Sequence, residues 1–262
     1  MLALFLRMPY QQSGGHPTDH ISVSQLKMFL RCPLQYEFRY IKGLIVPSNG
    51  ARTLGKAVHS TLEQNYQQKI ETKKDLPLVQ WNQIFSDSWE LHLPETEFGK
   101  KENPGKLKDD GIRLLYAYYR QAAPKIRPVS VEKEFSVSIA GLKIPFVGHI
   151  DLIDENRYII DHKISKSSWA KGHEHTDIQL TGYALAYRRI TGKKEEGLRL
   201  DIMVRTTTPK IDQRQTSRNR EDFRRFRKLL IRVNRAIETG IFYPNANFLC
   251  PACGYSDLCK KW

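Results

Sequence analysis

The chain has 262 residues, 40% of them hydrophobic, which suits one large domain with a substantial core. Its 42 Lys and Arg residues outnumber its 28 Asp and Glu residues and give a formal net charge of +14. Such an excess favours a polyanionic partner, with nucleic acid first and a membrane surface second. The apolar runs are too short to span a bilayer or to act as a secretory signal, so we expect no membrane partner and a cytoplasmic location.

The predicted elements change type near residue 125. Residues 1–20 lack periodicity and are expected to form a flexible tail. Hydrophobic spacing of about 3.6 residues then predicts helices over 24–32, 33–43, 53–71, 77–92 and 107–122. Alternating patterns predict strands over 130–139, 143–153 and 158–164, followed by a helix at 176–191, a strand at 198–204 and a helix at 219–239. The predicted fold class is α/β, a mixed central sheet flanked by helices.

Two acidic residues stand on neighbouring apolar strands, at Asp151 and Asp161. A buried carboxylate without a partner is costly, and a divalent cation is one reason to keep it, because Mg²⁺ prefers oxygen ligands. Alternation places Asp161 and Lys163 on one face of their strand and His162 on the other. A metal with an ammonium beside it suits phosphodiester hydrolysis, whereas the plainer alternative is a salt bridge between Asp161 and Lys163.

The connection between these strands decides whether the two acids can share a site. Across a regular hairpin, Asp151 and Asp161 lie on the same face only if the loop has an odd number of residues, for example residues 155–157. We expect such a loop. Glu132 and Glu134 lie near the same sheet, and we expect them to be structural or solvated, with contact to a second metal as the alternative.

The cysteines are unevenly placed. Cys250, Cys253 and Cys259 lie within ten positions, and Cys32 is the remaining cysteine. A tetrahedral metal site needs a fourth ligand, so a single distant partner would join the two ends of the fold. Zinc and iron both accept thiolate ligands.

A basic stretch runs from Arg205 to Arg235, with eleven Lys or Arg residues against three Asp or Glu residues. Apolar residues at helical spacing leave the basic ones largely on other faces. The alternatives are a solvated charged surface and a phosphate-binding one. The candidate DNA-binding residues are Arg205, Arg220, Arg224, Arg227 and Lys228.

Several motifs together resemble one known family. Asp151 followed by Asp161-His162-Lys163 on the next strand is similar to the PD-(D/E)XK nuclease superfamily. Three further segments resemble its RecB-like branch: the histidine motif Gly55–His59 with Leu62-Glu63, the Gln-x-x-x-Tyr motif from Gln179 to Tyr183, and the opening from Ser24 to Tyr40. The cysteine pattern resembles the iron–sulfur members of that branch, including AddB-type and CRISPR-associated adaptation nucleases.

The resemblance implies a fold, a site and cofactors. The fold would be a restriction-endonuclease-like core in one domain over 21–262, with a helical part (about 21–125), a catalytic core (about 128–240) and a cysteine staple (241–262 plus Cys32). Mg²⁺ or Mn²⁺ would be held by His59, Asp151, Asp161 and the backbone carbonyl of His162, with Lys163 orienting the base or stabilising charge. Gln179 and Tyr183 would contact DNA or support the site, although each of Tyr183 and His59 could instead be a packed helix residue. Cys32, Cys250, Cys253 and Cys259 would hold a [4Fe–4S] cluster, with structural Zn²⁺ as the alternative.

The predicted function is therefore a metal-dependent DNA nuclease, more an exonuclease than an endonuclease. It would act on single-stranded or unwound DNA ends in repair, recombination or CRISPR adaptation. The sequence contains no helicase P-loop, so unwinding would come from a helicase partner or another recombination or adaptation protein. The alternatives are a non-catalytic DNA-end-binding module and a zinc-stabilised DNA-binding protein.

Overall fold

The computed structural model describes residues 17–262, which form two compact units, each described by itself. Unit 1 comprises residues 17–47, 135–148 and 219–262, and unit 2 comprises residues 48–134 and 149–218. Residues 1–16 of the predicted tail lie outside the described residues. The single domain over residues 21–262 stays a prediction.

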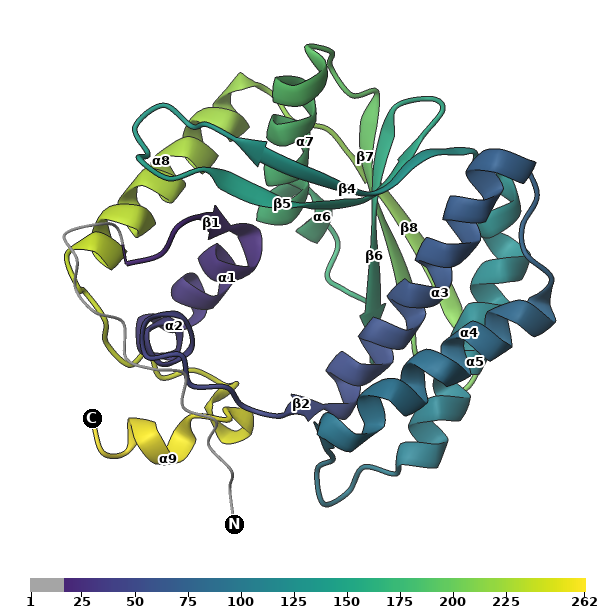
Figure 1. Ribbon diagram of the computed structural model, residues 1–262, viewed down its shortest axis with the longest axis horizontal. Coiled ribbons are helices and arrows are strands. Elements are labelled where there is room, and N and C mark those ends of the chain that lie inside the picture. The colour runs from purple at the N-terminus through teal and green to yellow at the C-terminus, as the bar shows by residue number, and fades with distance from the viewer. Residues whose placement is uncertain (1–16) are drawn as a thin grey trace. The chain divides into compact units, whose positions relative to one another are not determined.

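Three long helices form one layer of unit 2 (Figure 1). They are α3 (Gly50–Thr72), α4 (Leu78–His92) and α5 (Pro104–Gln121). Asn49 begins α3 and Asn103 begins α5, and each side chain accepts a hydrogen bond from a backbone N–H of the first turn. α3 ends at Lys73, whose φ of 62° is left-handed. The short strands β2 (Ser48–Asn49) and β3 (Thr96–Glu97) pair in parallel beside these helices.

The core of unit 2 lies between these helices and the sheet. Trp81, Phe85 and Trp89 recur every fourth residue of α4 and are almost fully buried. They belong to one hydrophobic cluster with residues of α3 and α5 and with Leu152, Ile160 and Met203 of the sheet. One face of the sheet is thus covered by the helical layer.

The sheet of unit 2 is mixed, as predicted. Its strands are β4 (Pro128–Val137), β5 (Phe146–Asp154), β6 (Tyr158–Ser165), β7 (Gly197–Val204) and β8 (Lys210–Thr216), the first two of which continue into unit 1. β5 and β6 are antiparallel, β6 and β7 parallel, and β7 and β8 antiparallel. After the short helix α6 (His173–Thr176), α7 (Ile178–Thr191) packs against β6 and β7 on the face away from the helical layer.

The hairpin between β5 and β6 has the odd loop that a shared site requires. Leu152 pairs with Ile160 and Ile153 with Ile159, so the loop between Asp154 and Tyr158 has three residues. Arg157 closes it with a left-handed φ of 65°. Continued by one residue, this register sets Asp151 opposite Asp161. The expectation of an odd loop is confirmed.

Unit 1 brings the two ends of the described chain together. Its elements are β1 (Ile21–Ser22), α1 (Val23–Arg31), α2 (Pro33–Tyr36), a π-helical turn (Glu37–Ile41), α8 (Arg220–Glu238), a 3₁₀ turn (Cys250–Ala252) and α9 (Ser256–Cys259). β1 pairs in parallel with Phe146 and Val147 of β5. Ser22 and Gln25 form a capping box at the start of α1. Phe226 of α8 packs edge-on against Phe146, which fixes α8 on its part of the sheet.

The predicted order of elements lacks one strand that the structure contains. The sequence does not predict β8, because Ile211 is the one apolar residue in Lys-Ile-Asp-Gln-Arg-Gln-Thr. β8 pairs with β7 alone among the described strands, so its outer edge needs no apolar pattern. Among the described residues, no helix is long and apolar enough to cross a membrane.

The close contact between α3, α4 and α5 generates a stability prediction. A Cβ atom added at Gly111 in α5 would lie 2.7 Å from Leu54 Cδ1 and closer still to the Phe85 ring. We expect Gly111→Ala to lower the free energy of unfolding by about 2 kcal/mol, although alanine is the better helix former. Gly55→Ala in α3 is the matched control, because nothing lies within 4 Å of its added Cβ, and it should stabilise the protein slightly. Urea unfolding of both variants measures the difference, and a stabilised Gly111→Ala protein would contradict the packing argument.

Candidate active site

Two carboxylates and a lysine meet on the α7 face of the hairpin. Lys163 Nζ lies 2.6 Å from Asp161 Oδ2, as strand alternation predicts. Asp161 is fully buried, and the side chain of Asp151 is 10% exposed. β6 lies between β5 and β7, so the pair is not a surface salt bridge at a sheet edge.

Asp161 has more acceptor capacity than its neighbours use. Its Oδ1 is buried and receives no hydrogen bond from the described residues. Buried carboxylate oxygens rarely stay unpaired, because the lost hydration is expensive. The register places Asp161 opposite Asp151, and its buried oxygen without a donor fits a divalent cation.

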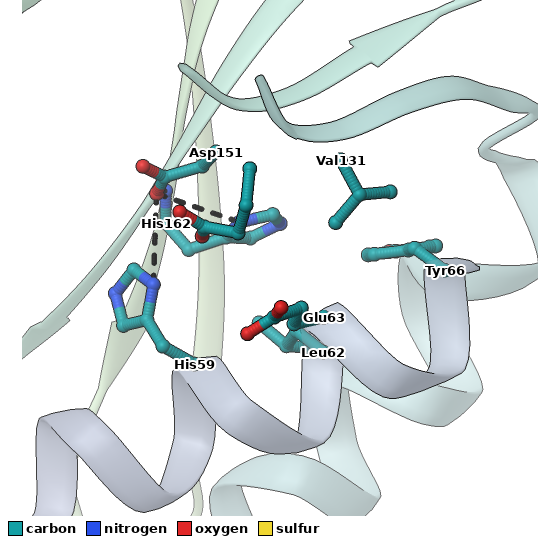
Figure 2. Close-up of a pocket in the computed structure, with 8 residues that line it drawn as sticks. His59, Leu62, Glu63, Tyr66, Val131, Asp151 and His162 are labelled. Carbon is teal, nitrogen blue, oxygen red and sulfur yellow. Dashed lines mark hydrogen bonds and ion pairs between the residues drawn. The ribbon is translucent and has the colours of Figure 1, made fainter. Parts of the chain in front are cut away.

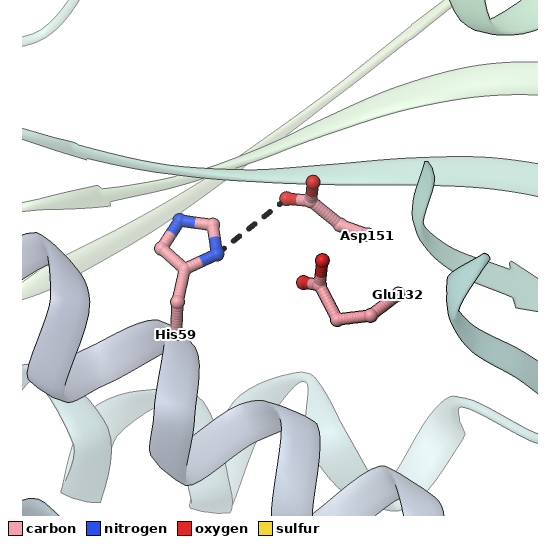
Figure 3. A group of neighbouring side chains, drawn as sticks. All are labelled: His59, Glu132 and Asp151. Atoms are coloured by element: carbon pink, nitrogen blue, oxygen red, sulfur yellow. Dashed lines mark ion pairs between the residues drawn. The ribbon is translucent and has the colours of Figure 1, made fainter. Parts of the chain in front are cut away.

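Two further ligand atoms lie beside Asp151 (Figure 3). One ligand atom each of His59, Glu132 and Asp151 lies within 4.8 Å of the others. His59 comes from α3 and places Nδ1 3.7 Å from Asp151 Oδ2. Glu132 comes from β4, where its φ of 45° is left-handed and turns its side chain out of the regular alternation. Imidazole nitrogen and carboxylate oxygen are both ligands for Mn²⁺, and the carboxylates suit Mg²⁺.

The pKa values of the three acids are shifted in different directions, down for Asp151 and up for Asp161 and Glu132. Burial would raise the pKa of Asp151, but His59, Lys163 and the other neighbouring donors lower it below its usual range. Burial raises the pKa of Asp161 to about 7, against the effect of Lys163. Burial and the charge of Asp151 likewise raise the pKa of Glu132 to about 7. Neighbouring carboxylates with separated pKa values are typical of catalytic and metal sites.

Gln179 and Tyr183 of α7 reach the same carboxylate. Gln179 Nε2 donates to Tyr183 Oη at 2.7 Å, and Tyr183 Oη donates to Asp151 Oδ1 at 3.3 Å. Asp177 begins α7 and accepts hydrogen bonds from the N–H groups of Gln179 and Leu180, which fixes the first turn. The two side chains therefore share one helix face, as their spacing predicts, and hold Asp151 from the α7 side.

The His162 ring lines the pocket, although strand alternation places its side chain on the opposite face of β6 from the side chain of Asp161. Its backbone N–H donates to Asp151 Oδ2 at 3.1 Å. Burial lowers the pKa of the His162 imidazole to about 4, so the ring is neutral at physiological pH. Figure 2 shows its ring beside Asp151. The pocket is lined by His59, Leu62, Glu63, Tyr66, Val131, Glu132, Asp151 and His162.

The four cysteines belong to unit 1, where their segments pack together. Cys32, Cys253 and Cys259 pack against the cluster of Leu34, Phe38 and Tyr255. Backbone N–H groups reach two of the sulfurs, from Asn245 to Cys32 at 3.4 Å and from Asn247 to Cys250 at 3.3 Å. Burial raises the pKa of the Cys259 thiol, and the other three cysteines add to that rise, so all four lie within electrostatic range. Cys32 thus lies with the C-terminal trio.

The basic residues divide between the units. Arg205 of unit 2 lies 3.4 Å from Asp110 and is largely buried. In unit 1, Arg224 pairs with Glu221 and Arg227 donates to the carbonyl of Ala140 at 2.7 Å. Arg220 and Lys228 are exposed, and no acid among the described residues pairs with them. Arg232 and Arg235 of α8 are exposed as well, so the exposed charge of α8 is not confined to these two residues.

Glu132 lies in the site, although the sequence favours a structural or solvated role for it and for Glu134, with contact to a second metal as the alternative. Both residues have the same parity along their strand, and the left-handed backbone at Glu132 breaks that parity. Glu134 behaves as expected, with its side chain 84% exposed beside His149. A bulge of this kind carries no clear sequence signature when the residue is not glycine.

A mixed α/β sheet with an acid, an acid and a lysine on one hairpin defines a nuclease-like fold. The model of the PD-(D/E)XK nuclease superfamily matches residues 20–260, and the chain belongs to this superfamily. No curated protein matches the chain.

Two solved structures are similar to this chain at low sequence identity. A candidate exonuclease from Eubacterium rectale has a TM-score of 0.65 and 17% identity, over 93% of this chain and 88% of that one. The protein SSO0001 has a TM-score of 0.46 and 16% identity, over 93% of this chain and 86% of that one. The first of these likenesses supports the fold.

The raised pKa of Asp161 predicts a pH-dependent stability. An unfolded aspartate ionises near pH 4, but the folded group ionises near pH 7, so the folded state loses stability as the pH rises between these values. Asp161→Asn removes this loss. Without metal, the free energy of unfolding of the variant relative to wild type should grow by on the order of 2 kcal/mol from pH 5 to pH 8. Glu134→Gln, at an exposed acid, is the control, and a difference for Asp161→Asn that does not change with pH would contradict the assignment.

Proposed function

We propose that the protein is a metal-dependent DNA nuclease that hydrolyses phosphodiester bonds. The observation that carries the proposal is the pair of opposed carboxylates, Asp151 and Asp161, with Lys163 beside them and an oxygen of Asp161 left without a donor. A salt bridge alone needs one carboxylate and would leave no buried oxygen unsatisfied.

The metal would be Mg²⁺ or Mn²⁺. His59, Asp151, Asp161 and the backbone carbonyl of His162 would hold it. Glu132 of β4 would join this set, because its carboxylate lies close to His59 and Asp151. The cation would supply charge to neutralise the phosphate and a lowered pKa for the attacking water.

The neighbouring side chains have distinct roles in this proposal. Lys163 places an ammonium beside Asp161, where it stabilises negative charge that develops on the phosphate. Tyr183 orients Asp151 through its hydroxyl, and Gln179 orients that hydroxyl in turn. Oriented in this way, Asp151 keeps its second oxygen for the cation.

The substrate would be a DNA end, single-stranded or unwound, and the reaction more exonucleolytic than endonucleolytic. The family resemblance and the name of the structure from Eubacterium rectale support this choice. The positive charge of the chain supports a nucleic acid, and Arg220, Arg224, Arg227 and Lys228 on α8, with Arg205, are the proposed phosphate contacts. A helicase or a recombination, repair or CRISPR-adaptation protein would supply unwound DNA in the cytoplasm.

A non-catalytic DNA-end-binding module is the main alternative. Such a module needs positive charge but has no use for a half-buried lysine paired with one of two opposed acids. We therefore favour catalysis over binding alone.

Alanine substitutions test the catalytic assignment. Asp151→Ala, Asp161→Ala and Lys163→Ala should each lower cleavage of end-labelled single-stranded DNA at least 100-fold with Mg²⁺ or Mn²⁺, because the aspartates would hold the cation and Lys163 would stabilise charge on the phosphate. Circular dichroism and DNA affinity should stay near wild type. Glu134→Ala, an exposed acid near the site, is the matched control and should cleave normally. Full cleavage by any of the three variants would remove that residue from the mechanism.

We also propose that Cys32, Cys250, Cys253 and Cys259 hold a [4Fe–4S] cluster, with structural Zn²⁺ as the alternative. Their convergence in unit 1 supports a shared metal centre. Thiolates crowded together repel one another, and a bound cation offsets this repulsion. The centre would link α1 and α2 to the C-terminal segment across more than two hundred residues.

Single cysteine substitutions test this staple. Each Cys→Ser change should lower the free energy of unfolding by roughly 3 kcal/mol or more, as expected for loss of a cross-link that closes a long loop. The cleavage chemistry should survive at low temperature, because the active site lies in unit 2. Anaerobically purified protein should be brown and contain iron and sulfide. A colourless protein with stoichiometric zinc would select the zinc alternative, and no bound metal would refute the staple.

A further inference from the structure

A buried chain of polar groups extends from the His162 ring away from the pocket. The ring stacks on Tyr66, with ring centroids 6.0 Å apart, and meets Tyr118 edge-on at 5.6 Å. Its Nε2 lies 2.9 Å from Tyr118 Oη. Tyr118 Oη lies 2.8 Å from Asp201 Oδ2 and 3.2 Å from Tyr66 Oη. All four side chains are almost fully buried, so their hydrogen bonds have to be satisfied within the protein.

The far end of this chain is firmly anchored. Arg199 donates to both oxygens of Asp201, at 2.7 and 3.1 Å, and Gln213 Nε2 lies 3.1 Å from each oxygen. Asp201 is therefore the acceptor in each of these hydrogen bonds, as a carboxylate paired with an arginine is.

This anchor determines where the protons of the chain lie. Tyr118 has one hydroxyl proton, and it goes to Asp201, because a carboxylate can only accept. Tyr118 Oη must then accept from His162, so His162 carries its proton on Nε2. Tyr66 donates to the same oxygen. Among the described residues, no acceptor lies within hydrogen-bond distance of Nδ1, since Asp151 Oδ2 is 3.9 Å away, so Nδ1 keeps an unprotonated lone pair.

The His162 ring lines the same pocket as the candidate metal ligands His59, Glu132 and Asp151. Nδ1 of His162 is 3.9 Å from Asp151 Oδ2 (Figure 2). Neither atom has a proton to donate to the other, so a cation bound beside them would offset their repulsion. The family resemblance implies that the backbone carbonyl of His162 holds the metal, whereas in the structure the His162 side chain lines the pocket as well.

We propose that the His162 side chain is a second imidazole donor of the metal site, held in its donor-ready tautomer by Tyr118 and Asp201. Tyr118 is then a positioning residue that does not touch the metal. The inference rests on the proposed metal-dependent function. It adds a nitrogen to the His59, Asp151 and Asp161 set and explains why a tyrosine and an ion pair lie behind a residue that the motif leaves unspecified.

A purely structural role for His162 predicts a hydrogen-bond partner for both ring nitrogens, because such partners stabilise a packed histidine. The polar neighbour of Nδ1 among the described residues is Asp151, which lies beyond hydrogen-bond distance. If Nδ1 carried the proton, Tyr118 would have to turn its hydroxyl from a carboxylate to Nε2. The charged acceptor is the stronger one, which favours the assigned direction.

Two matched substitutions test the proposal. Tyr118→Phe removes the acceptor of the Nε2 proton and lets the proton move to Nδ1, where it can donate to Asp151. Tyr66→Phe removes a buried hydroxyl from the same cluster but leaves the His162–Tyr118–Asp201 link intact, so it controls for packing. Mn²⁺ affinity, measured by electron paramagnetic resonance without DNA, should fall tenfold or more in Tyr118→Phe, as is usual for loss of a group that orients a metal ligand. Tyr66→Phe should bind Mn²⁺ within about twofold of wild type, since it leaves that orienting link in place.

A spectroscopic measurement tests the tautomer without metal. In protein labelled with ¹⁵N at histidine, the His162 signals, assigned by their absence in His162→Gln, should show the proton on Nε2 in wild type and in Tyr66→Phe. Tyr118→Phe should shift it towards Nδ1. A proton on Nδ1 in wild type, or an equal loss of Mn²⁺ affinity in both Tyr→Phe variants, would overturn the proposal. Unchanged Mn²⁺ binding by Tyr118→Phe would overturn it while leaving the proposed nuclease intact, whereas a wild-type protein that binds no Mn²⁺ would refute both.

Discussion

The structure around the site depends on two carboxylates that face each other across one hairpin. A three-residue loop sets the register, and that register puts Asp151 opposite Asp161. Like charges at this separation, removed from water, destabilise the folded protein unless positive groups or a cation lie among them. The surrounding residues can be understood as the response to this constraint, since Lys163, His59 and the His162 amide all approach these oxygens. They stabilise one acid fully and leave the other with a raised pKa.

The two faces of the sheet contribute different chemistry to the same carboxylate. α7 supplies neutral hydrogen-bond donors, because Tyr183 and Gln179 hold one oxygen of Asp151 in place. α3 supplies an imidazole from His59 on the other side of the strand. The dense packing of α3 against α4 and α5 makes that imidazole a fixed group, since the buried aromatic rings of α4 leave the helix little freedom to shift. The position of the His59 imidazole in the site therefore depends on the packing of the core of this unit.

Much of this arrangement follows from sequence patterns. Hydrophobic periodicity predicts the long helices and the central strands, and alternation predicts that Lys163 lies beside Asp161. The loop length predicts the shared face of the acids. Patterns fail where the local backbone departs from its ideal or where apolar residues are absent. Glu132 enters the site through a left-handed residue inside a strand, and β8 is polar because it pairs on one side only among the described strands. Neither feature follows from periodicity.

The His162 ring shows a third limit of sequence patterns. Alternation correctly places the residue on the face of α3 and α5, and a histidine there is normally a packing residue. Its chemical role depends on the direction of one hydroxyl proton on Tyr118, a residue 44 positions earlier in the chain. That direction depends in turn on Asp201, whose charge is held by Arg199 on the same strand. A property of the site is therefore set by an ion pair that is linked to His162 through Tyr118, by hydrogen bonds whose partners come from three separate elements. Such a chain can be recognised only when the donors and acceptors are counted in three dimensions.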